Sequence, residues 1–338
     1  MINAAKNNKK SLSKSKRKDL ICYTCFMIWP VAQFLIFYVL VNFNSIRLAF
    51  QSISMEKSGG KYFYSYDHFT FDSFKRLFDK NELVSIVSRD MWQMIGTSLK
   101  AYLLLLCVGV PLGLFFSYYM YKRMTGAKVF RVLLFLPSIL SAVVVGRIFL
   151  QFFDSALPSM LKDFAKIFPS GMENWLLEKI PKEGFYSADR MGMIMFFNVF
   201  VGFGTSVLMY SNKMIGIDPS ISEAASLDGA TGLKEFWYVT LPQVFSTLQV
   251  FLVTGVIGIF SNQFNLLTFL NNWGVDDPAR MKTLGFYLYV YAKDAAAQPN
   301  MKEYTPPLAA LGLLFTAVAI PLTFGVKALL EKFGPSEE

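Results

Sequence analysis

Six long runs of apolar residues limit what this 338-residue chain can fold into more than any other feature of its sequence. The hydrocarbon core of a bilayer is about 30 Å thick, which an α-helix of roughly 20 apolar residues can cross. Lipid offers no hydrogen-bond partners, so a crossing segment must satisfy its own backbone groups, as a helix does. We therefore predict an all-α polytopic membrane protein with six transmembrane helices. The runs lie at residues 23–45, 97–121, 132–153, 191–211, 244–270 and 306–330.

The charged segments between these runs predict the orientation of the chain. A tail rich in Lys and Arg precedes the first run, and the connection YKRMTGAKVFR between the second and third runs carries four basic residues and no acid. Because Lys and Arg accumulate in cytoplasmic segments, we expect both termini in the cytoplasm. The net charge of +9 comes largely from these segments, so it does not indicate nucleic-acid binding. The expected parts are a basic tail at 1–19, the first helix with an outer loop at 20–91, a transmembrane domain at 92–330 and a C-terminal tail at 331–338.

Residues that could form a catalytic or metal site are scarce. Cys22 and Cys25 form a C-x-x-C pair without a second pair of ligands, Cys107 lies inside the second run, and His68 is the sole histidine. The phosphate-binding pattern G-x-x-x-x-G-K-[ST] is absent. We therefore predict no catalytic residues, no metal site and no ATP hydrolysis by this chain itself.

One polar stretch interrupts the apolar pattern between the fourth and fifth runs, and it reads EAASLDGATGLKEFWYVTLPQV from residue 223. Just before it, Asp218 followed by Pro219 is a typical helix start, and Gly229 within it is a typical helix end. A second short helix is expected to begin after residue 231 or 232 and to stop at Leu241-Pro242. The stretch thus predicts a compact helical hairpin on the cytoplasmic side. A surface helix that only covers its own bundle is the alternative.

Within this stretch, the sequence resembles the binding-protein-dependent ABC importer permeases. These permeases carry a motif of the form E-A-A, three residues, G, nine residues, I, one residue, L-P in the loop before the penultimate span. The chain has Val239 at the isoleucine position and matches elsewhere, at Glu223, Ala224, Ala225, Gly229, Leu241 and Pro242. The segments LDGA, FLPSILSAVVV, NVFVGFG and MKTLGFYLYVYA are similar to the carbohydrate-uptake, maltose-type branch. Two departures concern substrate contacts, because Phe200 stands where the family often has Trp and NNWGVDDP replaces a T-x-G-G-P-like segment.

The resemblance implies a fold, an activity and a set of partners. The fold is that of a type I ABC importer permease, with the loop at 218–242 as its coupling helix. The chain would be a non-catalytic plasma-membrane subunit that imports a carbohydrate, with an oligosaccharide favoured, by alternating access. The implied partners are a second homologous permease, an extracellular solute-binding protein, and two ATPase subunits that bind ATP and Mg.

The same resemblance assigns roles to residues of the loop. Phe236 and Trp237 are expected to hold the second helix of the hairpin against the bundle. The residues implied in coupling to the ATPase are Glu223, Ala224, Ala225, Asp228, Gly229, Leu241 and Pro242.

Amide side chains at bilayer depth are candidates for a sugar path, because polar groups there are functional suspects. If the fifth helix runs to residue 270, Asn262 and Asn265 lie three residues apart, and Ser261 and Asn265 lie four apart, so they share a face. The candidate path contains Asn198, Asn262, Gln263 and Asn265. Polar residues that only hold helices together are the alternative.

Other classes of protein fit the sequence less well. A secondary transporter or channel would favour charged residues in the middle of the spans, where this chain has almost none. A membrane enzyme would need acids, His or Cys clustered at one membrane face, and a scaffold leaves the motif unexplained. Within ABC importers, an amino-acid or phosphate permease is the nearest alternative.

Overall fold

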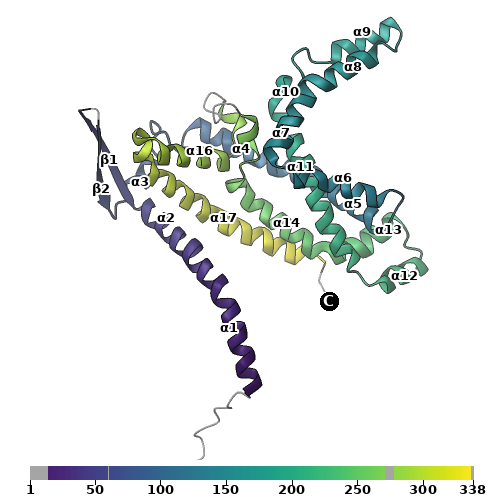
Figure 1. The fold of residues 1–338 in the computed structure, drawn as a ribbon, viewed down its shortest axis with the longest axis horizontal. Coiled ribbons are helices and arrows are strands. Elements are labelled where there is room, and N and C mark those ends of the chain that lie inside the picture. The colour runs from purple at the N-terminus through teal and green to yellow at the C-terminus, as the bar shows by residue number, and fades with distance from the viewer. Residues whose placement is uncertain (1–13, 60, 271–277, 336–338) are drawn as a thin grey trace, which may run out of the picture.

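The computed structural model describes residues 14–59, 61–270 and 278–335, and it consists mainly of helices with one two-stranded hairpin (Figure 1). Within these residues, six helical segments are long and apolar enough to cross a membrane. They are Cys22–Ala49, Arg89–Tyr121, Ala142–Ala165, Arg190–Ile215, Leu233–Ser261 and Pro299–Lys332. The predicted all-α polytopic fold is therefore confirmed.

The helices follow one another with short connections. The first half contains α1 (Lys14–Phe34), α2 (Val41–Ala49), β1 (Gln51–Ser58), β2 (Lys61–His68), α3 (Asp72–Arg76), α4 (Arg89–Leu104), α5 (Val110–Tyr121), α6 (Ala127–Ile139), α7 (Ala142–Gln151), α8 (Leu157–Ala165), α9 (Ser170–Lys179) and α10 (Phe185–Ala188). The second half contains α11 (Arg190–Ile215), α12 (Pro219–Leu227), α13 (Leu233–Glu235), α14 (Leu241–Ser261), α15 (Leu266–Phe269), α16 (Leu284–Ala297) and α17 (Thr305–Phe333). Short π-helical turns continue α1 into α2, α4 into α5, α7 into α8 and α13 into α14.

The ends of the chain are more helical than the sequence predicts. Since α1 begins at Lys14 and α17 ends at Phe333, residues 14–19 and 331–333 of the predicted tails belong to helices. Residues 1–13 and 336–338 of those tails lie outside the described residues, as does most of the segment NNWGVDDP.

The third apolar run is not the single helix predicted for residues 132–153. Helix α6 ends at Ile139, Leu140 is extended with ψ 153°, and α7 begins a new helix at Ala142. Pro137 lies inside the last turn of α6 and has no N–H to donate to the carbonyl four residues back. The turn is weakened there, and the run divides into two shorter helices.

The fifth span is also shorter than the predicted run to residue 270. Helix α14 ends at Ser261, Asn262 is extended, and Phe264 and Asn265 have positive φ values of 55° and 54°. The predicted helical face shared by Ser261, Asn262 and Asn265 is therefore wrong. A tight turn of the backbone occupies residues 262–265, and the short α15 follows it.

Three groups of buried side chains hold the bundle together. They centre on Tyr210 between α5, α11 and α14, on Phe197 between α7, α11 and α15, and on Leu311 between α4, α16 and α17. Helices α6 and α11 approach closely at Gly204, where an added Cβ would lie 1.9 Å from the carbonyl oxygen of Leu134. The bundle therefore depends on a glycine at this crossing.

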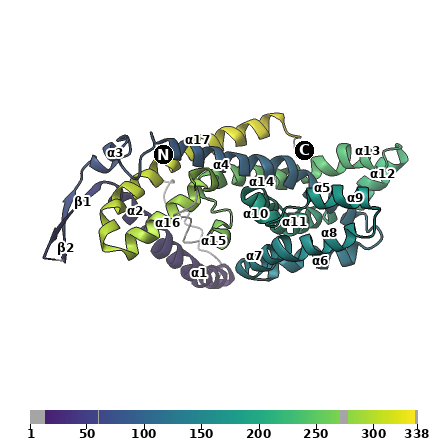
Figure 2. The same ribbon diagram turned by 90° about the horizontal axis from the view of Figure 1, so that it is seen from above.

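The first span stands apart from this bundle. In Figures 1 and 2, α1 runs away from α14 and α17, and none of the most apolar part of the span is buried. Its C-terminal part, α2, packs against α17. The start of α1, the end of α17 and the α12–α13 hairpin lie toward one side of the molecule, whereas the β1–β2 hairpin and α8–α10 lie toward the other (Figure 1).

Candidate coupling hairpin and polar sites

The coupling hairpin, defined here as residues 218–242, begins with the predicted capped helix. The Asp218 side chain accepts a hydrogen bond from the Ser220 N–H at 2.9 Å and so caps α12. The same interaction with Ser220 holds the pKa of the Asp218 carboxyl below its usual value. A side-chain acceptor and Pro219 in the first turn thus fix where α12 starts.

Helix α12 ends in a Schellman motif. The N–H of Ala230 donates to the Ala225 carbonyl at 2.9 Å, and the N–H of Gly229 donates to the Ser226 carbonyl at 3.1 Å. Gly229 has φ +75°, a left-handed conformation that glycine adopts at little cost. The predicted helix end at Gly229 is therefore confirmed.

The second arm of the hairpin differs from the prediction. It does not stop at Leu241-Pro242, because α13, a π-helical turn at Phe236–Thr240 and α14 form one continuous span, Leu233–Ser261. The Leu241 N–H donates to the Phe236 carbonyl, five residues back. This wider turn accommodates Pro242 in the first turn of α14, where a missing N–H costs little.

The hairpin exposes a mixture of acidic and large apolar side chains. Glu223 and Asp228 are exposed, and so are Leu227 at 89%, Leu233 at 65% and Tyr238 at 80%. Leu227 lies outside the apolar spans and Leu233 at the very start of one, and large apolar side chains this exposed beside charged groups are typical of a surface that contacts another protein. The side of the hairpin that faces away from the bundle is thus the part suited to a partner.

The other motif residues lie closer to the bundle or at its edge. Ala224 is exposed, whereas Ala225 is buried against the chain itself, and Leu241 and Pro242 are half-buried at the base of the hairpin. Phe236 is buried against Tyr118, as predicted. Trp237 is 60% exposed, so the prediction that it packs on the bundle is wrong.

A buried cluster under the hairpin escaped sequence analysis. Glu235 is 3% exposed, and its Oε1 atom lies 2.5 Å from Nζ of Lys122, which caps the C-terminal end of α5. The Ser222 hydroxyl of α12 also donates to Oε1. Tyr118 Oη lies 3.4 Å from Glu235 Oε2 and donates to the Gly232 carbonyl at 2.9 Å. The one sequence signal for this cluster is that Glu235 is the sole acid between Asp228 and Asp276.

The predicted sugar-path amides are brought together differently from the prediction. Asn198 donates to the Phe264 carbonyl at 2.9 Å, and Asn265 donates to Asn198 Oδ1 at 2.8 Å. Asn262 accepts from the Phe264 N–H at 2.8 Å. These bonds hold the 262–265 turn against α11. Holding helices together is the alternative role that the sequence allowed for these amides. Gln263 lies in the same turn, half-buried.

Two cavities lie near the C-terminal end of α14. One, of about 380 Å³, lies between α4 and α14 and has polar groups from Ser98, Tyr102, Thr254, Asn262 and Thr283 among its lining.

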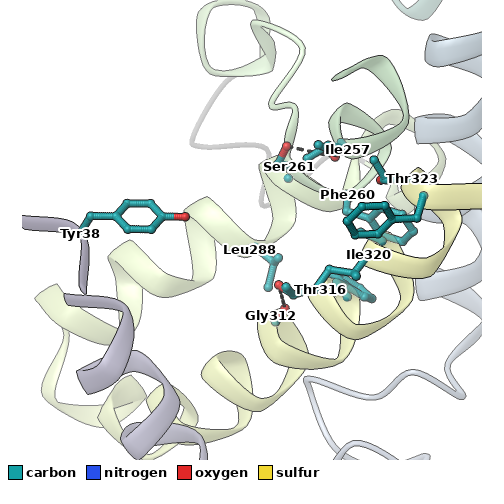
Figure 3. Close-up of a pocket in the computed structure, with 13 residues that line it drawn as sticks. Tyr38, Ile257, Phe260, Ser261, Leu288, Gly312, Thr316, Ile320 and Thr323 are labelled. Atoms are coloured by element: carbon teal, nitrogen blue, oxygen red, sulfur yellow. Dashed lines mark hydrogen bonds between the residues drawn. The ribbon is translucent and has the colours of Figure 1, made fainter. Parts of the chain in front are cut away.

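The second cavity has a volume of about 710 Å³ and is mostly apolar. Figure 3 shows Tyr38 reaching from the first span toward the helices that carry Ser261, Leu288 and Thr316. This cavity therefore lies where the first span diverges from the bundle.

Comparisons with known proteins agree with this architecture, although no protein-family model matches the chain. The polygalacturonan/rhamnogalacturonan transport system permease protein YteP of Bacillus subtilis is 29% identical over 131 residues, which are 39% of this chain and 38% of YteP. The multiple sugar-binding transport system permease protein MsmF of Streptococcus mutans is 26% identical over 240 residues, 71% of this chain and 76% of MsmF. The match thus spans well under two thirds of the first relative and about three quarters of the second.

Solved structures extend the similarity to the whole fold. A bacterial ABC transporter involved in the import of the acidic polysaccharide alginate matches with a TM-score of 0.67 at 18% identity, over 95% of this chain and 98% of that chain. A bacterial alginate ABC transporter in complex with an alginate pentasaccharide-bound periplasmic protein matches with a TM-score of 0.66 at 18% identity, over 94% and 96%.

Together these features define a class. The chain is a multi-pass membrane protein with the fold of an ABC importer permease. In sequence it is similar to sugar ABC transporter permeases, which confirms the resemblance indicated by its E-A-A motif.

Proposed function

We propose that the chain is the permease subunit of an ATP-driven ABC importer and that it moves a carbohydrate across the plasma membrane by alternating access. The observation that carries this proposal is the exposed coupling hairpin, in which the E-A-A motif forms a capped helix outside the apolar spans. The similarity to sugar permeases supports the substrate class. We infer cytoplasmic termini, because the start of α1 and the end of α17 lie toward the same side as the hairpin.

The hairpin is the proposed docking element for a cytoplasmic ATPase that binds ATP and Mg. Its exposed acids, Glu223 and Asp228, would pair with basic groups of the ATPase, while Leu227 and Leu233 would enter an apolar groove. Gly229 fixes the turn between the arms, and Leu241 and Pro242 fix the base. ATP-driven closure of two ATPase subunits would then move the hairpin and tilt the bundle.

A second permease subunit is the proposed neighbour of the first span. The most apolar part of this span is not buried within the described residues. Its large aromatic side chains are exposed, as Phe37 is at 71%. A homologous bundle seated between α1 and α17 would cover them. The cavity beside Tyr38 lies on this surface.

For the substrate, we propose an oligosaccharide delivered by an extracellular solute-binding protein. The proposed path contains the polar cavity between α4 and α14 and the amides Asn198, Asn262, Gln263 and Asn265. Hydroxyl and amide groups suit sugar hydroxyls, because each donates and accepts hydrogen bonds. The alginate importer, whose solved complex holds an oligosaccharide-bound periplasmic protein, supports this class of substrate.

Co-purification tests the proposal. Wild-type protein, solubilised gently from the membrane, is expected to bring down an ATPase and a second permease, identified by mass spectrometry. Glu223→Arg should lose the ATPase and keep the permease, because it reverses a charge on the exposed face of α12. Glu178→Arg, an exposed change on α9 at the other side of the molecule, is the matched control and should keep both. Absence of both partners from the wild-type sample would refute the proposed function.

A further inference from the structure

The coupling hairpin has little apolar contact with the bundle it is proposed to move. Ala225 is the sole buried residue of α12, and a methyl group cannot fix the rotation of a helix. The polar contacts of α12 with the buried cluster are made by Ser222, whose hydroxyl donates to Glu235 and accepts from Lys122 Nζ at 3.3 Å. The orientation of α12 therefore depends on where the Glu235 carboxylate is held, together with the Lys122 ammonium that pairs with it.

Glu235 is held by charge and by hydrogen bonds from another span. Lys122, which follows α5 directly, donates from Nζ to Oε1 at 2.5 Å, and Tyr118 Oη of α5, which donates to the Gly232 carbonyl at 2.9 Å, lies 3.4 Å from Oε2. A carboxylate that is 3% exposed is tolerated only when it is paired in this way. One side chain thus connects α12, the start of the fifth span and the inner end of the second span.

The second span leads from this cluster to the polar cavity. It is continuous over Arg89–Tyr121, and Ser98 and Tyr102 near its other end line the cavity of about 380 Å³. A displacement of α12 that is passed to Lys122 and Tyr118 would therefore be passed along a helix that contacts the proposed substrate path.

We propose that Glu235 is a positioning residue, which locks α12 to the inner end of α5 so that the hairpin and the second span move as one body. This role rests on the proposed function, since it concerns how movement of an ATPase reaches the bundle. Without the lock, α12 would rotate on its Gly229 and Gly232 turns, and ATP hydrolysis would continue without transport.

The test combines a distance measurement with an activity ratio. In full-length protein in lipid nanodiscs, with Cys22, Cys25 and Cys107 replaced by Ser, spin labels are placed at Leu112→Cys on α5 and Leu227→Cys on α12. Both positions are exposed, and the label distance reports the orientation of α12. The unlabelled complex with its co-purified partners gives sugar transported per ATP hydrolysed.

Glu235→Gln is expected to replace a single narrow distance distribution by a broad one. It should also lower transport per ATP by about tenfold or more, the scale of losing a hydrogen bond to a charged group. Lys122→Met should also fold less well, since it leaves a buried carboxylate unpaired, and adding Glu235→Leu to it should restore the yield of folded protein but neither the narrow distribution nor the ratio. Ser222→Ala removes only the link to α12 and keeps the buried ion pair. It is the variant to measure if the charge variants fold poorly. The control is Glu331→Gln, the same change in an exposed ion pair with Lys327.

The outcomes separate the two proposals. If Glu235→Gln and Ser222→Ala both keep the narrow distribution and the wild-type ratio, Glu235 is not a positioning residue, while the proposed function stands. If the wild-type protein brings down no ATPase, the proposed function fails and the positioning role falls with it. A broad distribution accompanied by a reduced ratio, with Glu331→Gln unchanged in both, supports the lock.

Discussion

Substitutions at Gly229 measure how strongly the end of α12 depends on one backbone conformation. Its φ of +75° lies in the left-handed region, and no atom lies within 4 Å of the place where a Cβ would be added. The cost of a side chain here is therefore conformational and not steric. An L-residue in the left-handed region costs about 1–2 kcal/mol, and loss of glycine's freedom in the unfolded chain returns about 0.4–1 kcal/mol.

The net cost of Gly229→Ala is therefore on the order of 1 kcal/mol, or about a fivefold rise in local opening of the helix end. Gly229→Val should cost more, because a β-branched side chain is strained at positive φ. Gly229→Asn should stay close to the wild type, because Asn visits this region readily.

Hydrogen exchange of the protein in nanodiscs provides the assay. The N–H groups of residues 229 and 230 close the Schellman motif. Their exchange should be fastest in Gly229→Val, slower in Gly229→Ala, slower again in Gly229→Asn and slowest in the wild type. The unchanged amides of α11 are the internal reference. Equal protection in all four proteins would refute the reasoning, since it would mean that the turn does not depend on the left-handed residue.

Two further predictions concern the bundle. Gly204→Leu should prevent close packing of α6 on α11, because its Cβ would lie 1.9 Å from the Leu134 carbonyl oxygen, whereas Gly202→Ala has open space and should be tolerated. The fraction of monodisperse protein after solubilisation measures both effects. Equal fractions for the two variants would contradict the packing argument. Asn198→Ala should lower stability by about 1–3 kcal/mol, because the partners of its amide in the 262–265 turn lose their bonds; a thermal midpoint unchanged from wild type would show that the turn does not need this amide.

The sequence predicts those parts of the fold that depend on local patterns. Apolar runs of sufficient length predicted the number of spans and overlap each of them, although the third span, Ala142–Ala165, covers only part of the predicted 132–153, and the Asp218 and Gly229 signals located both ends of α12. The errors occur where a local break overrides a run of apolar residues. Pro137 precedes the break between α6 and α7, and the turn at 262–265 interrupts a stretch whose composition suits a helix.

The contacts that position the site are non-local and could not be predicted from residue spacing. Lys122 and Glu235 are 113 residues apart, and Asn198 and Asn265 are 67 residues apart. Their side-chain types were visible in the sequence, but the pairing depends on how the spans pack. The prediction that Trp237 faces the bundle was wrong for a related reason, since the π-helical turn at Phe236–Thr240 changes which side chains face inward.

The isolation of α1 has a consequence for how the cell must make this protein. The most apolar part of the first span is not buried within the described residues, so this helix can insert into the membrane without help from the bundle, while the packing of α2 on α17 ties its C-terminal end to the rest of the chain. A copy synthesised without a neighbour would leave this helix free to drift and to pair with unrelated apolar helices. If the proposed second permease covers α1, balanced synthesis of the two subunits and prompt degradation of any excess would be conditions for correct assembly.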